Sequence, residues 1–171
     1  HGEGHSFPTR RSSDLAIDRE HPECPPDPER YLTDEGQQRT RRAARGLKRL
    51  DIRPDRVISS PWRRAVETAE IYADVLGLDP TDLDRRDDLL PDAAPRSIVD
   101  HLRTLDTDCP IVVGHAPHVD LLVATLLGAE GRTMSSLKKS GAASIVLATA
   151  DSDAWLEWLL TPKMLRRLGR A

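Results

Sequence analysis

The stretch that decides the fold reads Ser59-Ser60-Pro61-Trp62-Arg63-Arg64-Ala65 and continues to Thr68-Ala69. In it, an apolar run of strand type ends in polar residues just before a helical pattern. The same layout recurs in Ile111-Val112-Val113-Gly114-His115. Ligands of open α/β sheets bind at the carboxyl ends of the strands, so we expect Arg64 and His115 to face one crevice. A cation beside a histidine, over helix amino termini, suits a phosphoryl group.

Outward from these two stretches, helical spacing alternates with short apolar runs. Thr33 is the expected N-cap of a first helix, and Ser60 is the expected N-cap of a second helix that has Pro61 at its first position. Gly77 and Gly128 are expected just after the ends of two helices. The alternation predicts a three-layer α/β/α fold with a mainly parallel sheet, to which the last two strands can add an antiparallel edge. The predicted helices span residues 34–50, 61–76, 95–105, 118–127 and 163–170, the predicted strands span residues 56–60, 111–113, 142–148 and 154–160, and an acidic loop is predicted at residues 78–94.

The chain has 171 residues and a net charge of −3, from 25 basic and 28 acidic side chains. This length predicts one domain with a real core, and the mixed charge gives no sign of nucleic-acid or membrane binding. Cys24 and Cys109 lie far apart, so no disulfide framework is expected and the expected location is a reducing cytoplasm. The longest apolar stretch, residues 121–129, is too short to span a bilayer, and no secretory signal is apparent.

Each candidate residue also has an ordinary structural interpretation. An isolated arginine pair such as Arg63 and Arg64 is usually solvated, and a lone histidine such as His115 is more often structural. The strand-Ser-Pro context favours a site for Arg64, and Gly114 lets a ligand approach the backbone before His115. His115 and His118 have the spacing of half a metal site, but no third or fourth ligand is apparent, so no metal is expected.

Three motifs occur in the order seen in the histidine phosphatase superfamily, which the chain therefore resembles. They are Leu32-Thr33-Asp34-Glu35-Gly36, Ser59-Ser60-Pro61 with Arg64-Ala65, and Val113-Gly114-His115. The chain looks most like the small SixA-type branch, which Pro117-His118, Leu137-Lys138-Lys139 and residues 158–163 also resemble. The resemblance covers residues 16–168 and implies a phosphoglycerate mutase-like fold.

The resemblance implies a phosphatase that acts on phosphohistidine or phosphomonoesters with no metal or other cofactor. In this family a histidine of an Arg-His-Gly motif attacks phosphorus, while arginines and a second histidine hold the phosphoryl oxygens. The resemblance implies that Arg64 is one of these arginines, that His115 is the second histidine, and that Gly114 helps to bind substrate. The implied partner is a phosphorylated protein or a small phosphoester. The proton donor stays open among three acidic residues after the second helix, which are Asp87, Asp88 and Asp92.

The amino terminus departs from the family, which opens with a buried strand ending in Arg-His-Gly-x-Ala. This chain opens with His1-Gly2-Glu3, and one interpretation makes His1 the nucleophile. In a second interpretation, residues 5–15 resemble a translated sequencing adapter, and Ser13 stands in place of the nucleophile if Ala16 is the alanine of the motif. We therefore expect residues 1–15 to be a non-native or disordered leader and residues 16–171 to form a single domain.

Both interpretations predict weak or absent phosphatase activity for the chain with this amino-terminal sequence. An unactivated serine is a poor nucleophile, and a histidine that no strand holds loses the benefit of precise positioning. The alternative function comes from a different class of protein. It is a non-catalytic phosphate- or phosphoprotein-binding module that keeps Arg64 and His115. The sequence leaves the oligomeric state open.

Overall fold

The computed structural model describes residues 15–148 and 153–170. The helices are α1 (Asp34–Arg49), α2 (Arg63–Leu76), α3 (Pro95–Thr104), α4 (His118–Leu126) and α5 (Pro162–Leu168), with short 3-10 helices η1 (Asp27–Glu29) and η2 (Asp87–Leu89). The strands are β1 (Arg56–Ser59), β2 (Asp84–Arg85), β3 (Pro110–Val113), β4 (Ala142–Leu147) and β5 (Ala154–Leu160). None of the described helices is both long and apolar enough to cross a bilayer.

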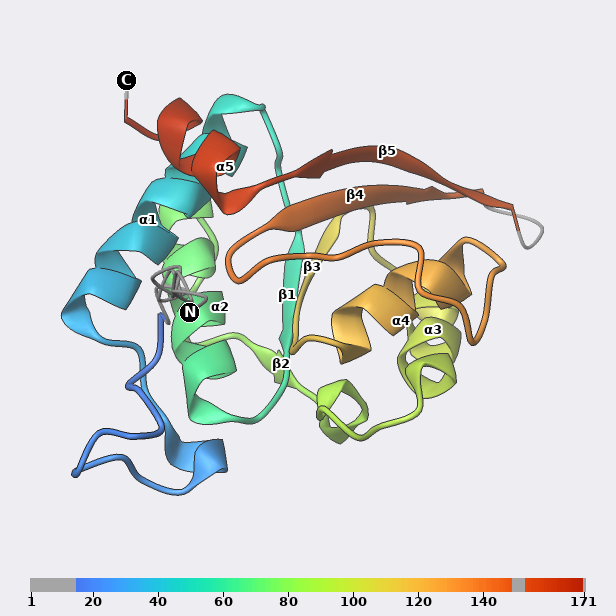
Figure 1. Ribbon diagram of the computed structural model, residues 1–171. Helices are drawn as coiled ribbons and strands as arrows, with labels where there is room; N and C mark the ends of the chain where they lie inside the picture. Colours follow the sequence, from blue (N-terminus) through green and yellow to red (C-terminus); the bar gives the residue numbers. More distant parts are fainter. Residues whose placement is uncertain (1–14, 149–152, 171) are drawn as a thin grey trace, which may run out of the picture.

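The parallel sheet has the strand order β2-β1-β3, and the predicted three-layer arrangement around it is confirmed. Figure 1 shows α1 and α2 on one side of these strands and α3 and α4 on the other. Ser59 at the end of β1 lies opposite Val113 at the end of β3. The chain leaves β1 toward α2 on one face and leaves β3 toward α4 on the other face. A topological switch point therefore lies between the carboxyl ends of β1 and β3.

Two parts of the sheet differ from the prediction. β2 lies in residues predicted to be a loop, because Asp84 and Arg85 carry no apolar signal. β4 and β5 pair antiparallel as predicted, but in the described residues they form a separate two-stranded sheet and not an edge of the parallel sheet. The pair still contributes to the core, since Ile145 of β4 packs on the cluster around Ile58 of β1.

Capping residues mark some of the helix boundaries. The hydroxyl of Thr33 accepts a hydrogen bond from the Gly36 amide at 3.0 Å at the start of α1, as predicted. Gly77 follows α2 with a φ of 84°, in the left-handed region that glycine adopts readily. The predicted start of α2 is wrong, because its N-cap is Trp62 and not Ser60. The Ser60 hydroxyl is engaged with a different part of the chain.

One residue of the expected leader, Leu15, belongs to the described part of the chain. Leu15 is buried, and it packs with Leu32 and Ile71 in a small hydrophobic cluster. Leu15 therefore contributes an apolar side chain to the core, and the division into a leader and a single domain stays a prediction. The rest of the expected leader, residues 1–14, lies outside the described residues, and so does His1.

Candidate active site

The segments that follow β1 and β3 stay side by side and bring Ser60 next to His115. The backbone amide of Ser60 donates to the carbonyl oxygen of Val113 at 2.9 Å. A hydrogen bond of 2.7 Å joins the Ser60 hydroxyl to Nε2 of His115. The Trp62 amide donates to the same hydroxyl oxygen at 3.3 Å, so the Ser60 side chain links the start of α2 to the imidazole. Ser60, predicted only as a helix cap, is thus the partner of the candidate histidine.

The surroundings of His115 disfavour a positive charge on its ring. The residue is 8% exposed. Burial lowers the pKa of His115 most, the positive charge of Arg64 lowers it further, and the pKa falls to about 4 although the carboxylate of Asp27 acts in the opposite direction. The imidazole is therefore neutral at pH 7 and can take up a proton when an anion binds beside it.

Trp62 contacts both predicted site residues. The guanidinium carbon of Arg64 lies 4.7 Å from the centroid of the Trp62 ring. The ring of His115 lies 5.0 Å from the Trp62 ring, centroid to centroid, at an angle of 57°. The structure thus brings Arg64 and His115 together around one indole, in the region where the first amides of α2 have no helical partner. Sequence reasoning missed this role of Trp62, although its place between Pro61 and the arginine pair was a usable signal.

The guanidinium of Arg64 already has an acceptor in the structure. Its Nη1 donates to the backbone carbonyl oxygen of Asp27 at 2.7 Å and lies 3.7 Å from the carboxylate of the same residue. That carboxylate also accepts hydrogen bonds from Arg30 at 3.0 Å and from Arg19 at 3.3 Å. Burial would raise the pKa of Asp27, but the hydrogen bond from Arg30 and the charges of Arg64 and Arg19 lower it on balance. A carboxylate among guanidiniums occupies the kind of position that a phosphoryl group favours.

Gly114 has a packing reason to be glycine. A Cβ atom at this position would lie 3.0 Å from a methyl carbon of Val119 and 3.8 Å from one of Leu89. Gly114 therefore lets α4 and η2 close on the end of β3. A contact between Gly114 and substrate stays a prediction.

His118 is a second buried histidine near the site. It is 1% exposed, it opens α4, and neither ring nitrogen has a hydrogen-bond partner among the described residues. Burial lowers the pKa of His118, while the charge of Asp88 opposes the change. Arg86 holds Asp88 with hydrogen bonds of 2.9 and 3.0 Å. His118 also lowers the pKa of His115, so Asp88 and the two histidines are electrostatically linked.

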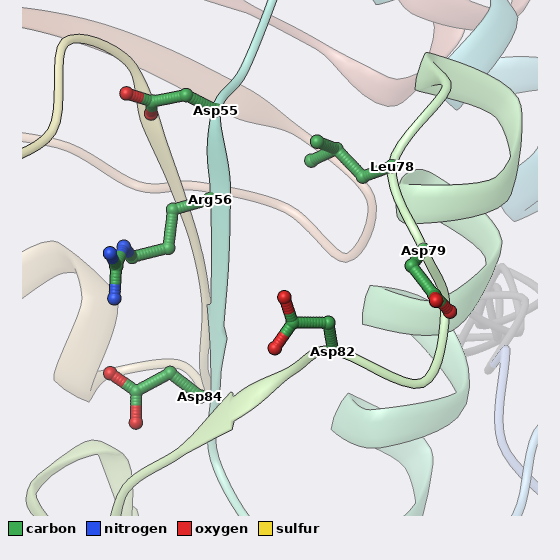
Figure 2. A pocket seen from close by; sticks show the side chains of 6 residues that line it. All are labelled: Asp55, Arg56, Leu78, Asp79, Asp82 and Asp84. Atoms are coloured by element: carbon green, nitrogen blue, oxygen red, sulfur yellow. The ribbon is translucent and has the colours of Figure 1, made fainter.

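Within the described residues, no group of three or more His, Cys, Asp or Glu side chains could hold a metal ion. A cavity of about 260 Å³ lies at the amino ends of β1 and β2 (Figure 2). His115 follows the carboxyl end of β3, at the other edge of the sheet. Two of the cavity's acids already have hydrogen-bond donors, since Asp55 accepts hydrogen bonds from Thr107 and Asp108, and Asp79 accepts two from Thr81. This cavity is lined by Asp55, Arg56, Leu78, Asp79, Asp82 and Asp84, none of which belongs to the predicted site.

Comparison with known proteins agrees with the motifs. The family model of the histidine phosphatase superfamily (branch 1) matches residues 21–89, a segment that includes Arg64 and ends before His115. The solved structure of the protein histidine phosphatase SixA complexed with tungstate has 29% identity and a TM-score of 0.76, and the alignment covers 89% of this chain and 94% of that chain. No match to a curated protein sequence was found.

Two further solved structures share the fold. The SixA of Agrobacterium tumefaciens has 19% identity and a TM-score of 0.68, over 86% of this chain and 92% of that chain. The SixA of Nakamurella multipartitia has 20% identity and a TM-score of 0.63, over 86% of this chain and 91% of that chain. Together with the family model, these likenesses confirm the predicted resemblance to the histidine phosphatase superfamily and its SixA-type branch.

Proposed function

Because the chain resembles the SixA-type histidine phosphatases in fold and motifs, we propose that it hydrolyses phosphohistidine or phosphomonoesters through a histidine nucleophile. The observation that carries this proposal is the meeting of Arg64 and His115 where β1 and β3 end. The solved SixA complex holds tungstate, an oxyanion with the tetrahedral shape of phosphate, which supports an oxyanion at the corresponding place here.

Each residue of the cluster has a proposed role. Arg64 exchanges its bond to Asp27 for phosphoryl oxygens and stabilises the charge that develops on them. His115, neutral before substrate binds, becomes a proton donor to the same oxygens once the anion raises its pKa. The source of the leaving-group proton stays open among Asp87, Asp88 and Asp92. Asp88 lies within the electrostatic reach of His118, but its carboxylate accepts hydrogen bonds from Arg86 and has no proton to give in this arrangement. None of these roles needs a metal.

The proposed reaction has two steps. A histidine nitrogen bonds to phosphorus while the leaving group departs with its electron pair and takes a proton. Water then attacks phosphorus, the histidine nitrogen recovers its electron pair, and phosphate is released. The nucleophile is assigned to residues 1–14, which contain His1 but no Arg-His-Gly sequence. We therefore expect slow turnover by the chain with this amino-terminal sequence.

The proposed substrate is a phosphorylated protein or a small phosphoester, and the proposed location is the cytoplasm. A phosphohistidine protein is favoured because the SixA structure with 29% identity is named a protein histidine phosphatase. Cys24 and Cys109 are free thiols, which suits a reducing compartment.

The test compares the chain with a variant in which an apolar strand ending in Arg-His-Gly replaces residues 1–14. The substrates are an aryl phosphate and a phosphohistidine protein, each assayed with and without chelator. The variant should gain turnover, form a trappable phosphohistidine and keep its rate in chelator. Within the variant, Arg64→Ala should lower turnover by ~10²–10³-fold. The matched control Arg63→Ala, whose side chain pairs with Glu67 on the surface, should leave the rate unchanged.

Several results would contradict the proposal. Oxyanion binding with no turnover in the variant would favour the non-catalytic phosphate-binding module instead. Equal rates in Arg63→Ala and Arg64→Ala would mean that Arg64 has no role in the reaction. Inhibition by chelator would contradict a metal-free reaction. Fast turnover by the unmodified chain, abolished by His1→Ala, would make His1 the nucleophile and contradict the expected slow turnover.

A further inference from the structure

The helices α1 and α5 approach each other closely and bring their basic side chains together. Figure 1 shows α5 lying against α1. A Cβ atom at Gly46 would overlap the carbonyl oxygen of Leu165, and one at Gly169 would overlap the carbonyl oxygen of Arg42. These two glycines fix the register of the helices, so the last residues of α5 and those just after it lie beside the first half of α1.

A cavity of about 230 Å³ lies where these side chains meet. Four of its six lining residues are arginines, and the only acid among them is Glu35, which already pairs with Arg39. No acidic side chain in the described part of the chain pairs with the other three arginines. The lining consists of Glu35, Gln38, Arg39, Arg42, Arg166 and Arg170.

The arginines of this cavity repel one another. Arg166 is half-buried, and burial lowers the pKa of its guanidinium more than any other cause. The positive charges of Arg39, Arg170 and Arg42 lower the same pKa further. A concave surface lined by one sign of charge concentrates its electric field and raises the local concentration of counter-ions. An anion with several charges would therefore relieve this repulsion.

The size and chemistry of the cavity select the kind of anion. A cavity of about 230 Å³ has room for a small anion but not for a folded domain. Arginine presents a planar fork of N–H donors that matches phosphate oxygens two at a time. We propose that the cavity between α1 and α5 binds a compact anion with several phosphate groups. This site shares no residue with the cluster around Arg64 and His115.

The test measures binding of inorganic triphosphate by titration calorimetry at low salt, with the full chain and three variants. In Arg166→Gln/Arg170→Gln the affinity should fall by about 10-fold or more, because hydrogen bonds to charged groups are lost. The control Arg45→Gln/Arg49→Gln removes the same charge from exposed positions of α1 outside the cavity, and its affinity should change less than about 3-fold. In Arg64→Ala, triphosphate should still bind to the cavity between α1 and α5 with unchanged affinity. Orthophosphate should bind more weakly than triphosphate.

The same measurements can overturn the proposal. An equal loss in the control variant would mean that triphosphate responds to overall charge and not to a cavity. A loss confined to Arg64→Ala would place triphosphate in the candidate active site. Binding of a short DNA duplex with no binding of triphosphate would make this face a nucleic-acid surface. Arg45, Arg49 and Arg170 are exposed and Arg166 is half-buried, and circular dichroism of each variant verifies that the fold is retained.

Discussion

His115 couples the candidate site to pH. Its pKa is about 4 in the folded chain, against an ordinary value of 6.5. Between these values the unfolded chain binds a proton that the folded chain does not, so stability is fully present above pH 6.5 and falls as the pH drops toward 4. This group alone should lower the free energy of unfolding by about 2 kcal/mol between pH 7 and pH 5. Urea unfolding at both pH values measures the difference.

Two variants isolate this effect of His115. His115→Gln cannot titrate and should lose that part of the pH dependence. His21→Gln, which changes an exposed histidine, should keep it. If both variants retain the full pH dependence, a different group is responsible.

Asp27 is placed to compete with an oxyanion for Arg64. Asp27→Asn removes a carboxylate that lies 3.7 Å from the guanidinium, so tungstate should bind roughly 2- to 5-fold more tightly, a modest gain because the pair is partly solvated. The same variant should be less stable, since Arg30 is only 5% exposed and loses its ionised partner. Calorimetry with tungstate measures the first effect and urea unfolding the second.

Asp51→Asn is the matched control for Asp27→Asn. It removes the same charge from a surface pair with Arg53 and should change neither quantity. Weaker tungstate binding in Asp27→Asn would show that Asp27 orients Arg64 and does not compete for it.

At the scale of elements, the contact between α1 and α5 depends on Gly46. Gly46→Ala would place a methyl group on the carbonyl oxygen of Leu165, so the helices must separate. Overpacking of this kind typically costs about 1–3 kcal/mol, and here it exceeds the gain in helix propensity from alanine. Urea unfolding should show this loss, whereas Lys48→Ala on the exposed side of α1 should change stability little. A Gly46→Ala variant as stable as wild type would mean that α5 docks loosely.

The same scale shows which elements the sequence can predict. α1 and α2 were predictable because a local residue marks a boundary of each, Thr33 at the start of α1 and Gly77 after the end of α2. The start of α2 was not predictable, because the Ser60 hydroxyl does not cap the helix and is hydrogen-bonded to His115, 55 positions away. β2 was missed because parallel pairing with β1 holds it and its own side chains are polar.

For the molecule as a whole, the sequence predicted the layers and the meeting of Arg64 and His115, since both follow from where parallel strands end. The sequence could not predict the hydrogen bond from Arg64 to Asp27. The two residues are 37 positions apart, and no local pattern indicates that they meet. The separation of β4 and β5 from the parallel sheet also depends on packing across the whole fold.

The arginine cavity between α1 and α5 gives the molecule an uneven charge distribution that its net charge of −3 conceals. Acids gather instead around a separate cavity at the amino ends of β1 and β2 (Figure 2). At pH 7.5 and low ionic strength, above the pI of about 6.1, the protein should still be retained on a cation-exchange column through its basic face. Arg166→Gln/Arg170→Gln should elute at lower salt than Arg45→Gln/Arg49→Gln, although both variants carry the same net charge. Identical elution of the two would mean that a chromatographic surface senses only the total charge of this protein.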